Sequence, residues 1–246
     1  MAGLQAAAVL DLWERAEHLD LVERTLALAA AGGPPVEVDE LASLPLGARD
    51  ARLLRLRTEL AGRSLVGTAA CPGCGGWVEF AADADEILAA DAGRSEQGPV
   101  EVDGYLIRWR APDSRDLAAA SAANDTAGAE RILLARCVLS VTAPDGEDAV
   151  DPLPAAARAA VARAMAAGDP LAEVLVDVTC PACSASFVAD LDLAGFVWAE
   201  VCASAERLLR EVAVLAGAFG WTESETLGLG DERRAAYLRL AHEGGA

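Results

Sequence analysis

The sequence predicts an α+β fold that is mostly α-helical and contains two small β elements. Of its 246 residues, 53% are hydrophobic and only 4% are aromatic, and alanine supplies much of the apolar content. Many alanines and few aromatic side chains favour closely packed helices over a sheet-dominated sandwich. Strand-like patterns are confined to one β-hairpin and to short stretches beside two cysteine pairs. A chain of this length and apolar content is expected to build a packed core.

The first 62 residues are predicted to form an N-terminal helical region. Apolar residues recur at helical intervals over residues 4–31, and Gly32-Gly33-Pro34-Pro35 ends that run. Residues 47–61 repeat the pattern, with their leucines expected to face the core. The arginines of this second segment are expected to point largely outward, as a solvated face or as a binding surface: Arg49, Arg52, Arg55 and Arg57.

Residues 85–170 are predicted to hold a β-hairpin followed by helices. In the hairpin, residues 100–102 and 105–110 flank Asp103-Gly104, a pair that satisfies the positive dihedral angles of a type I′ turn. The expected helices begin at Asp113 or Ser114 and run to Asn124, then cover residues 127–141 and 155–167, with a loop over residues 142–154.

Residues 192–246 are predicted to be helical again. A long apolar helical face is expected to end at Gly220. Thr222 and Glu225 have the spacing of a capping box, which predicts a short helix, and Gly230-Asp231 is expected to begin a last one.

Four cysteines form two matching Cys-Pro-x-Cys motifs between strand-like segments. This spacing lets a tight turn direct two thiolates at one metal ion. Two such turns complete a tetrahedron of thiolates and leave no coordination position for water or substrate. Cys71, Cys74, Cys180 and Cys183 are therefore predicted to hold one structural zinc ion, with an iron-bound site or two separate sites as alternatives.

The two motifs are far apart in the sequence, with 105 residues (75–179) between Cys74 and Cys180. Closing a loop of that length costs about 4.7 kcal/mol of chain entropy. Structural zinc binds with roughly 10–16 kcal/mol, so the metal can offset the closure. Residues 63–84 and 171–191 are thus predicted to be the two halves of one split, zinc-ribbon-like element. Residues 85–170 are an insertion between them, and the whole chain is expected to form one interwoven domain.

Thiol redox chemistry is the main alternative for these cysteines. Cys-Pro-x-Cys also occurs in glutaredoxin-like enzymes, where the first cysteine lies at a helix N-terminus that lowers its pKa. Here the residues after each motif, 75–78 and 184–187, continue as turn and strand. Cys137 and Cys202 fall within helical apolar patterns and are expected to be buried thiols.

The charge of the chain limits its partners. All 20 basic residues are arginine, and with 39 acidic residues the net charge is −19. Such a surface repels phosphate, which argues against binding to nucleic acids or anionic membranes. The remaining interpretations are binding to protein partners, or a charge that serves only to keep the protein soluble. The first apolar stretch is interrupted by Asp11 and Glu14, and no segment has the roughly 20 apolar residues of a membrane span. A cytoplasmic location is expected.

Catalytic patterns are nearly missing from the sequence. Without lysine there is no P-loop lysine, Schiff base or lysine general base. The only histidines, His18 and His242, lie near the termini outside any HExxH motif or triad. Asp83, Asp85 and Glu86 cluster where a helix would begin and are expected to complement its dipole. We expect a protein that is not an enzyme.

Several segments spread along the chain resemble one family. They are Leu12-Trp13-Glu14, residues 44–50 with 53–57, Cys71-Pro72-Gly73-Cys74 with Glu79-Phe80, Trp109-Arg110-Ala111-Pro112 with Asp116-Leu117, Arg136-Cys137-Val138, Cys180-Pro181-Ala182-Cys183, and Gly220-Trp221-Thr222-Glu223 with Arg233-Arg234 and Tyr237-Leu238. Together they resemble the baseplate hub assembly chaperones of contractile phage tails, and more closely their relatives encoded with extracellular contractile injection systems. The last segment is the most specific of them.

The resemblance implies a non-enzymatic assembly factor, a chaperone for the baseplate of a contractile phage tail or injection system. Its partners would be hub, spike or wedge proteins of the baseplate. A structural baseplate component, incorporated into the particle, is the nearest alternative. From other classes come a zinc-ribbon regulatory adaptor, against which the charge argues, and a thiol oxidoreductase.

Overall fold

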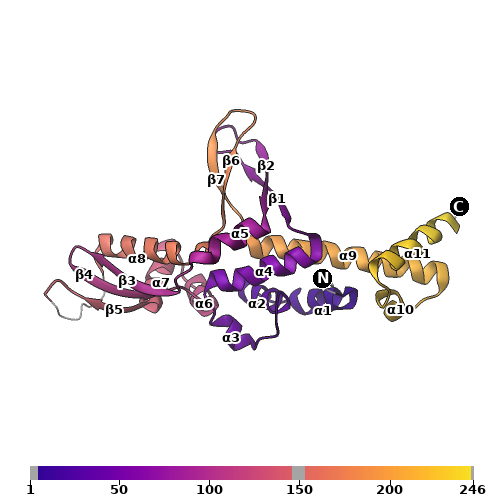
Figure 1. Cartoon of the computed structure of the whole chain (residues 1–246), viewed down its shortest axis with the longest axis horizontal. Helices are drawn as coiled ribbons and strands as arrows, with labels where there is room; N and C mark the ends of the chain where they lie inside the picture. The colour runs from indigo at the N-terminus through magenta and orange to yellow at the C-terminus, as the bar shows by residue number, and fades with distance from the viewer. Residues whose placement is uncertain (1–4, 146–152, 245–246) are drawn as a thin grey trace.

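Three parts extend from a central helical body in this computed structural model, which describes residues 5–145 and 153–244 (Figure 1). Two β-hairpins stand side by side on the body, one from early and one from late in the sequence, and we call them the thiol tower. A mixed α/β lobe, here called the inserted lobe, lies at one end of the molecule, and helices of the C-terminal arm lie at the other. The fold is α+β and mostly helical, as the sequence predicts.

The body is built from the N-terminal helices and the first part of the longest helix. Its helices are α1 (Ala6–Ala16), α2 (Leu21–Ala31), α3 (Val38–Ala42), α4 (Leu46–Ala61), α5 (Ala84–Ala90) and α9 (Leu193–Phe219), with the 3-10 turns η1 (Asp91–Gly93) and η2 (Pro170–Ala172). The apolar run over residues 4–31 divides in two because the Asp20 carboxylate caps α2, accepting a hydrogen bond from Glu23 N at 2.9 Å. Leu28, Leu53 and Val197 are fully buried between these helices.

Three of the four arginines of α4 correct the expectation that they point largely outward, whereas Arg55 is exposed as expected. Arg49, Arg52 and Arg57 are only 5–8% exposed. Their guanidinium groups lie inside the body, where each can donate several hydrogen bonds to buried oxygen atoms. Arg49 donates to Asp50 Oδ1 at 2.7 Å, and Arg52 donates to the carbonyl of Ala29 at 2.7 Å. The buried α4 arginines are therefore part of the core and form no binding surface.

The inserted lobe contains a three-stranded antiparallel sheet and three helices. Its elements are β3 (Gln97–Val102), β4 (Tyr105–Arg110), α6 (Ser114–Ser121), α7 (Thr126–Cys137), β5 (Val138–Thr142) and α8 (Ala155–Gly168), with strand order β3-β4-β5. The predicted turn is present, with φ of 48° at Asp103 and 80° at Gly104.

The helix predicted over residues 127–141 is wrong in its last residues, because α7 ends at Cys137 and residues 138–141 belong to β5. From Val138 onward, β-branched side chains favour pairing with β4, as in Ile107 opposite Val141. The expected loop over 142–154 falls largely on residues 146–152, outside the described ones.

The lobe is held on the body by backbone hydrogen bonds at the start of α4. Leu46 N donates to Pro112 O at 3.0 Å, and Gly47 N donates to Asp169 Oδ2 at 2.9 Å. A side chain at position 47 would meet this carboxylate, since a Cβ there would lie 2.1 Å from Asp169 Oδ1. Glycine at this position lets the lobe and the body approach closely.

The C-terminal arm consists of the end of α9 with α10 (Glu223–Leu227) and α11 (Asp231–Gly244). Gly220 ends α9 in the left-handed conformation, and Thr222 with Glu225 forms the predicted capping box. The Trp221 ring lies 4.7 Å from that of Tyr237, which joins α11 to the end of α9. Within the described part of the chain, no helix has both the length and the apolarity to cross a membrane.

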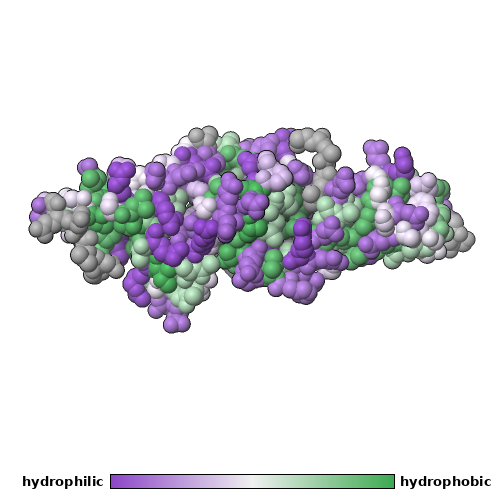
Figure 2. All heavy atoms as spheres, turned by 90° about the horizontal axis from the view of Figure 1, so that it is seen from below, coloured by the Kyte–Doolittle hydropathy of each residue, from purple (hydrophilic) through white to green (hydrophobic). Residues whose placement is uncertain are grey.

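Figure 2 shows the face of the molecule opposite the thiol tower, where hydrophobic and hydrophilic residues alternate along the whole length.

Candidate metal centre

The thiol tower is made of two hairpins that are separate two-stranded sheets. They comprise β1 (Ser64–Ala70) with β2 (Trp77–Asp83), and β6 (Leu175–Thr179) with β7 (Ser186–Asp190). The strands lie on both sides of each cysteine motif, as the sequence predicts. Each hairpin ends in a cysteine motif at its tip. The last paired residues before the turns are Ala70 with Trp77 and Thr179 with Ser186.

The two cysteine turns have the same backbone geometry. In the first, Cys71 N donates to Gly76 O at 2.8 Å and Gly75 N donates to Cys71 O at 2.8 Å. In the second, Cys180 N donates to Ala185 O and Ser184 N to Cys180 O, both at 2.9 Å. The residue after the second cysteine of each motif has positive φ, 73° at Gly75 and 59° at Ser184. This backbone turns both thiols of a motif to the same side.

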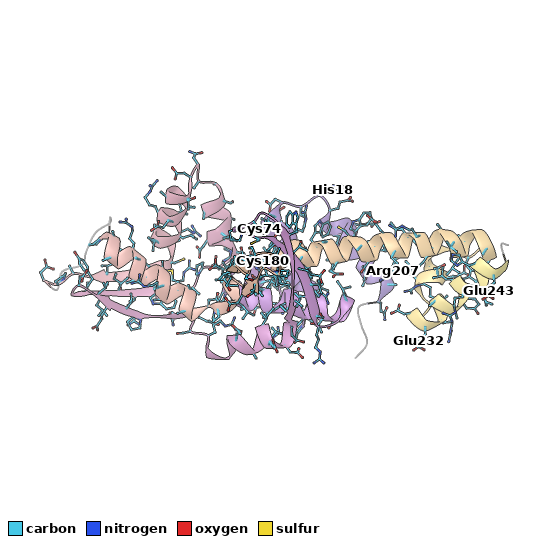
Figure 3. All side chains as sticks on the ribbon, turned by 90° about the horizontal axis from the view of Figure 1, so that it is seen from above. His18, Cys74, Cys180, Arg207, Glu232 and Glu243 are labelled. Atoms are coloured by element: carbon cyan, nitrogen blue, oxygen red, sulfur yellow. The ribbon has the colours of Figure 1, made fainter. Side chains whose placement is uncertain are left out.

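The four thiols come together at the tips of the two hairpins. Their sulfur atoms all lie within 4.8 Å of one another. Cys71 Sγ lies 3.5 Å from Cys183 Sγ, and Cys74 Sγ lies 3.8 Å from Cys180 Sγ, so sulfur contacts join one turn to the other. Figure 3 looks down on the tower and shows Cys74 and Cys180 side by side. The sequence-predicted site residues are thus brought into one cluster.

The spacing of the sulfur atoms fits a tetrahedral metal ion. Zinc–thiolate bonds of about 2.3 Å in a regular tetrahedron place the sulfurs about 3.8 Å apart. The observed 3.5 and 3.8 Å contacts are close to that edge length. The cysteine residues are free, with Cys71 and Cys180 buried and Cys74 and Cys183 exposed. A centre of this kind ties the turns together and keeps no ligand position open for a reacting molecule.

The electrostatics of the cluster also favour a bound cation. Hydrogen bonds from the backbone N–H groups of Cys183 and Ala182 lower the pKa of the Cys180 thiol to about 7. The Cys183 thiol accepts a hydrogen bond from Ala185 N–H, which lowers its pKa, but the neighbouring thiols outweigh this and raise it to about 12. Four thiolates this close repel one another, and a divalent metal removes that repulsion.

One face of each hairpin in the tower is packed into the main core. Val78 on β2 and Val178 on β6, each one residue from the last pair before a cysteine turn, are 4% and 5% exposed and belong to the same apolar cluster as Leu53 of α4. The opposite face is open to solvent, as at Trp77, next to Val78, with 76% of its surface exposed. The tower therefore buries one face up to the cysteine turns and exposes the other.

The other residues considered for chemistry lie apart from the thiols. Asp83 caps α5, accepting hydrogen bonds from Asp85 N and Glu86 N, which agrees with the expected dipole role. His18, in the turn between α1 and α2, and His242, on α11, are both exposed. Cys137 is fully buried, and that burial together with the Asp116 carboxylate raises its pKa to about 12, whereas Cys202 is only half-buried.

A buried ion cluster in the inserted lobe was missed by sequence reasoning. Asp116 is 0% exposed and accepts hydrogen bonds from Arg110 Nη1 and Arg136 Nε, each at 2.6 Å. Burial alone would raise the pKa of Asp116, but the hydrogen bonds from Arg110, from the Asp113 backbone and from Arg136 hold it well below its usual range. The available signal was the Asp113-x-x-Asp116 spacing, which forms a capping box at the start of α6. The cluster links β4, α6 and α7, so its role is to hold these elements of the lobe together.

The geometry therefore defines the class of site as a four-thiol, metal-compatible clamp between two hairpins. Beyond that class, no known protein family, curated protein or solved structure matches this chain. Its function has to be inferred from its own residues and their arrangement.

Proposed function

We propose that this protein is a non-enzymatic assembly factor whose two distant hairpins are clamped together by one structural zinc ion. The observation that carries the proposal is the meeting of four thiols, within 4.8 Å, from turns on either side of the inserted lobe. Zinc suits an all-thiolate tetrahedron and has no redox chemistry of its own. A closed centre of this type stabilises a shape, which is the requirement of a protein that acts by binding.

The proposed partner is a baseplate, hub or spike protein of a contractile tail. What supports this step is the family resemblance of the segments quoted above, together with the net charge of −19, which suits a protein client with basic surfaces. The resembling residues have packing and ion-pair roles: Arg110 and Arg136 meet at Asp116, and Trp221 contacts Tyr237. Such roles fit a binding scaffold.

Metal analysis tests the first part of the proposal. Protein purified without added metal should contain one zinc ion per chain by elemental analysis, and should lack the visible absorption of an iron–thiolate centre. A protein that is metal-free, and whose melting temperature a chelator does not change, would exclude the zinc clamp.

Deletion of the gene in the producing cell tests the second part. Complete particles should disappear, and tail proteins should copurify with the tagged chain. The level of the protein in purified wild-type particles then separates two roles, because only a structural component is present there in stoichiometric amounts. Normal assembly without the gene, with no tail protein bound to the tagged chain, would exclude the assembly function.

A further inference from the structure

A large apolar groove lies where the inserted lobe meets the body. Its volume is about 910 Å³, and it is bounded by α5, α7, α8, η2 and the first residue of β6. The apolar side chains that line it come from both sides of the junction: Ile87, Leu133, Leu134, Met165, Leu171 and Val174. Junctions between structural units are frequent places for binding sites, and this volume is at the upper end of the usual range.

The charged residues that line the groove all have the same sign. They are Glu86, Glu130, Glu173 and Asp169, and no arginine or histidine lines it among the described residues. Glu86 and Glu173 are exposed and form no ion pair within residues 5–145 and 153–244, whereas Glu130 faces Arg158 at 3.6 Å. An apolar floor with unpaired carboxylates at its edge is complementary to apolar side chains flanked by positive charge.

The two walls of the groove are fixed relative to each other. Asp169, which is 2% exposed, lies between them and accepts the hydrogen bond from Gly47 N that holds the lobe on the body. Leu171, next to it, is 1% exposed and belongs to the main core. Because the walls are already joined, a bound segment would meet a formed surface and would not have to order it.

We propose that this groove binds an apolar, helical segment of a protein partner that carries arginine or lysine beside its apolar side chains. The proposal rests on the assembly function proposed above and assigns that function to a surface. An amphipathic helix places apolar side chains at positions i, i+3, i+4 and i+7 on one face, which suits a groove with apolar side chains on both walls. Its basic side chains would pair with Glu86 and Glu173 at the edge.

Site-specific photo-crosslinking in the producing cell tests the groove. Ala166 and Ala167 are neighbouring exposed residues in the last turn of α8, and only Ala166 lines the groove. Each is replaced in turn by p-benzoylphenylalanine, and the crosslinked peptides are identified by mass spectrometry. We expect Ala166→p-benzoylphenylalanine to crosslink to one protein segment with basic residues, and the matched Ala167 variant to give at least about tenfold less of that product.

A second measurement tests the charge complementarity. The crosslinked segment, made as a fluorescent peptide, should bind the wild-type chain and lose affinity with added salt. Glu86→Gln and Glu173→Gln should each weaken binding by about two- to fivefold. Ala166→Arg should abolish binding while Ala167→Arg leaves it unchanged, with circular dichroism showing that both variants remain folded.

The outcomes separate the groove from the proposed function. Equal crosslinking from both positions, a crosslinked segment without arginine or lysine, or a non-protein adduct would overturn the groove proposal, and the assembly function would remain open to the deletion test. A basic segment from a protein unrelated to tails would support the groove and contradict the baseplate partner.

Discussion

The thiol tower and the three-stranded sheet of the inserted lobe differ in how their strands are covered. The contrast is plain in two tryptophans: Trp77, next to the first cysteine motif, is 76% exposed, whereas Trp109 on β4 is 4% exposed. In the tower, Val66 and Val188 are also about half exposed, at 48% and 56%. In the lobe, Ile107 and Trp109 pack on Val161 of α8 in an apolar cluster of the lobe's own. The strands of the lobe are covered by a core of the lobe's own, whereas the tower leaves one face of each hairpin open to solvent.

The difference lies in the elements that cover each set of strands. A two-stranded hairpin is only marginally stable alone, so the proposed link between the two tips would add stability to the tower. The lobe has a third strand, a covering helix and the buried carboxylate of Asp116. Its stability comes from ordinary burial, and it should be insensitive to metal.

The largest expected effect comes from removing the second cysteine motif. The double variant Cys180→Ser with Cys183→Ser should lose the metal completely, and with it a large part of the roughly 10–16 kcal/mol that structural zinc contributes. Elemental analysis and hydrogen exchange measure the result, with protection expected to vanish in the four tower strands and to persist in β3 and β4. Cys202→Ser is the control, because Cys202 lies outside the cluster. Full protection of the tower in the double variant would contradict the comparison.

The corresponding change in the lobe is Trp109→Ala. Truncating a buried tryptophan costs about 3–5 kcal/mol, and Trp109 also fills the space beside Gly168, where a Cβ would lie 2.4 Å from its ring. Urea denaturation should show this loss while the metal content stays at one ion per chain. Trp77→Ala is the matched control in the tower and should change stability by no more than about 0.5 kcal/mol. A loss of metal in the Trp109 variant would mean that the two units are not independent.

A smaller effect is expected for Asp116→Asn, at about 2–3 kcal/mol, because the variant leaves Arg110 and Arg136 with a neutral acceptor. The pH dependence identifies the cause. Since folding lowers the pKa of Asp116, its contribution is complete above the unfolded-state pKa of about 3.9 and is lost as the pH falls below that value.

The stability difference between wild type and Asp116→Asn should therefore shrink as the pH falls from about 5 towards 2. Comparing the two proteins at each pH cancels acid release of metal, which both share. A difference that stays constant over this range would show that the Asp116 charge has no role in stability.

The smallest effect is expected in the C-terminal arm, which has neither thiols nor a large core. Trp221 is half-buried and contacts Phe219 at 5.1 Å and Tyr237 at 4.7 Å between ring centroids. Trp221→Ala should cost about 1–2 kcal/mol and should remove near-ultraviolet circular dichroism from the aromatic group. Leu240→Ala, at a side chain that is 55% exposed, is the control. An unchanged melting curve for the Trp221 variant would identify this residue as a partner contact.

The sequence predicted local features well where one residue type decides the geometry. Gly220 ends α9, Asp103-Gly104 makes the hairpin turn, and the cysteine motifs lie at hairpin tips because their turns need specific backbone angles. The misplaced features depend on contacts between distant residues. Val138 continues a helical pattern in the sequence, but β4 offers it a strand partner.

The candidate site shows the same limit. The spacing within each motif was sufficient to identify the thiols, whereas the buried α4 arginines could not be recognised from periodicity. Arg49 reaches Ser114, which is 65 residues away, and Arg57 reaches Glu200, which is 143 residues away. The groove is also invisible in the sequence, because its walls come from segments that meet only after the lobe has docked.

The separation of the two cysteine turns has a consequence for synthesis of the chain. A ribosome that adds about 5–20 residues per second needs about 5–20 s to proceed from Cys74 to Cys180. During that interval only two of the four thiols of the cluster have been synthesised, and the inserted lobe has time to fold. The proposed four-thiol metal site could close only after the lobe has been synthesised, so metal capture would follow the lobe and precede α9. A nascent chain interrupted before Cys180 would carry the Cys71–Cys74 pair without its two partner thiols.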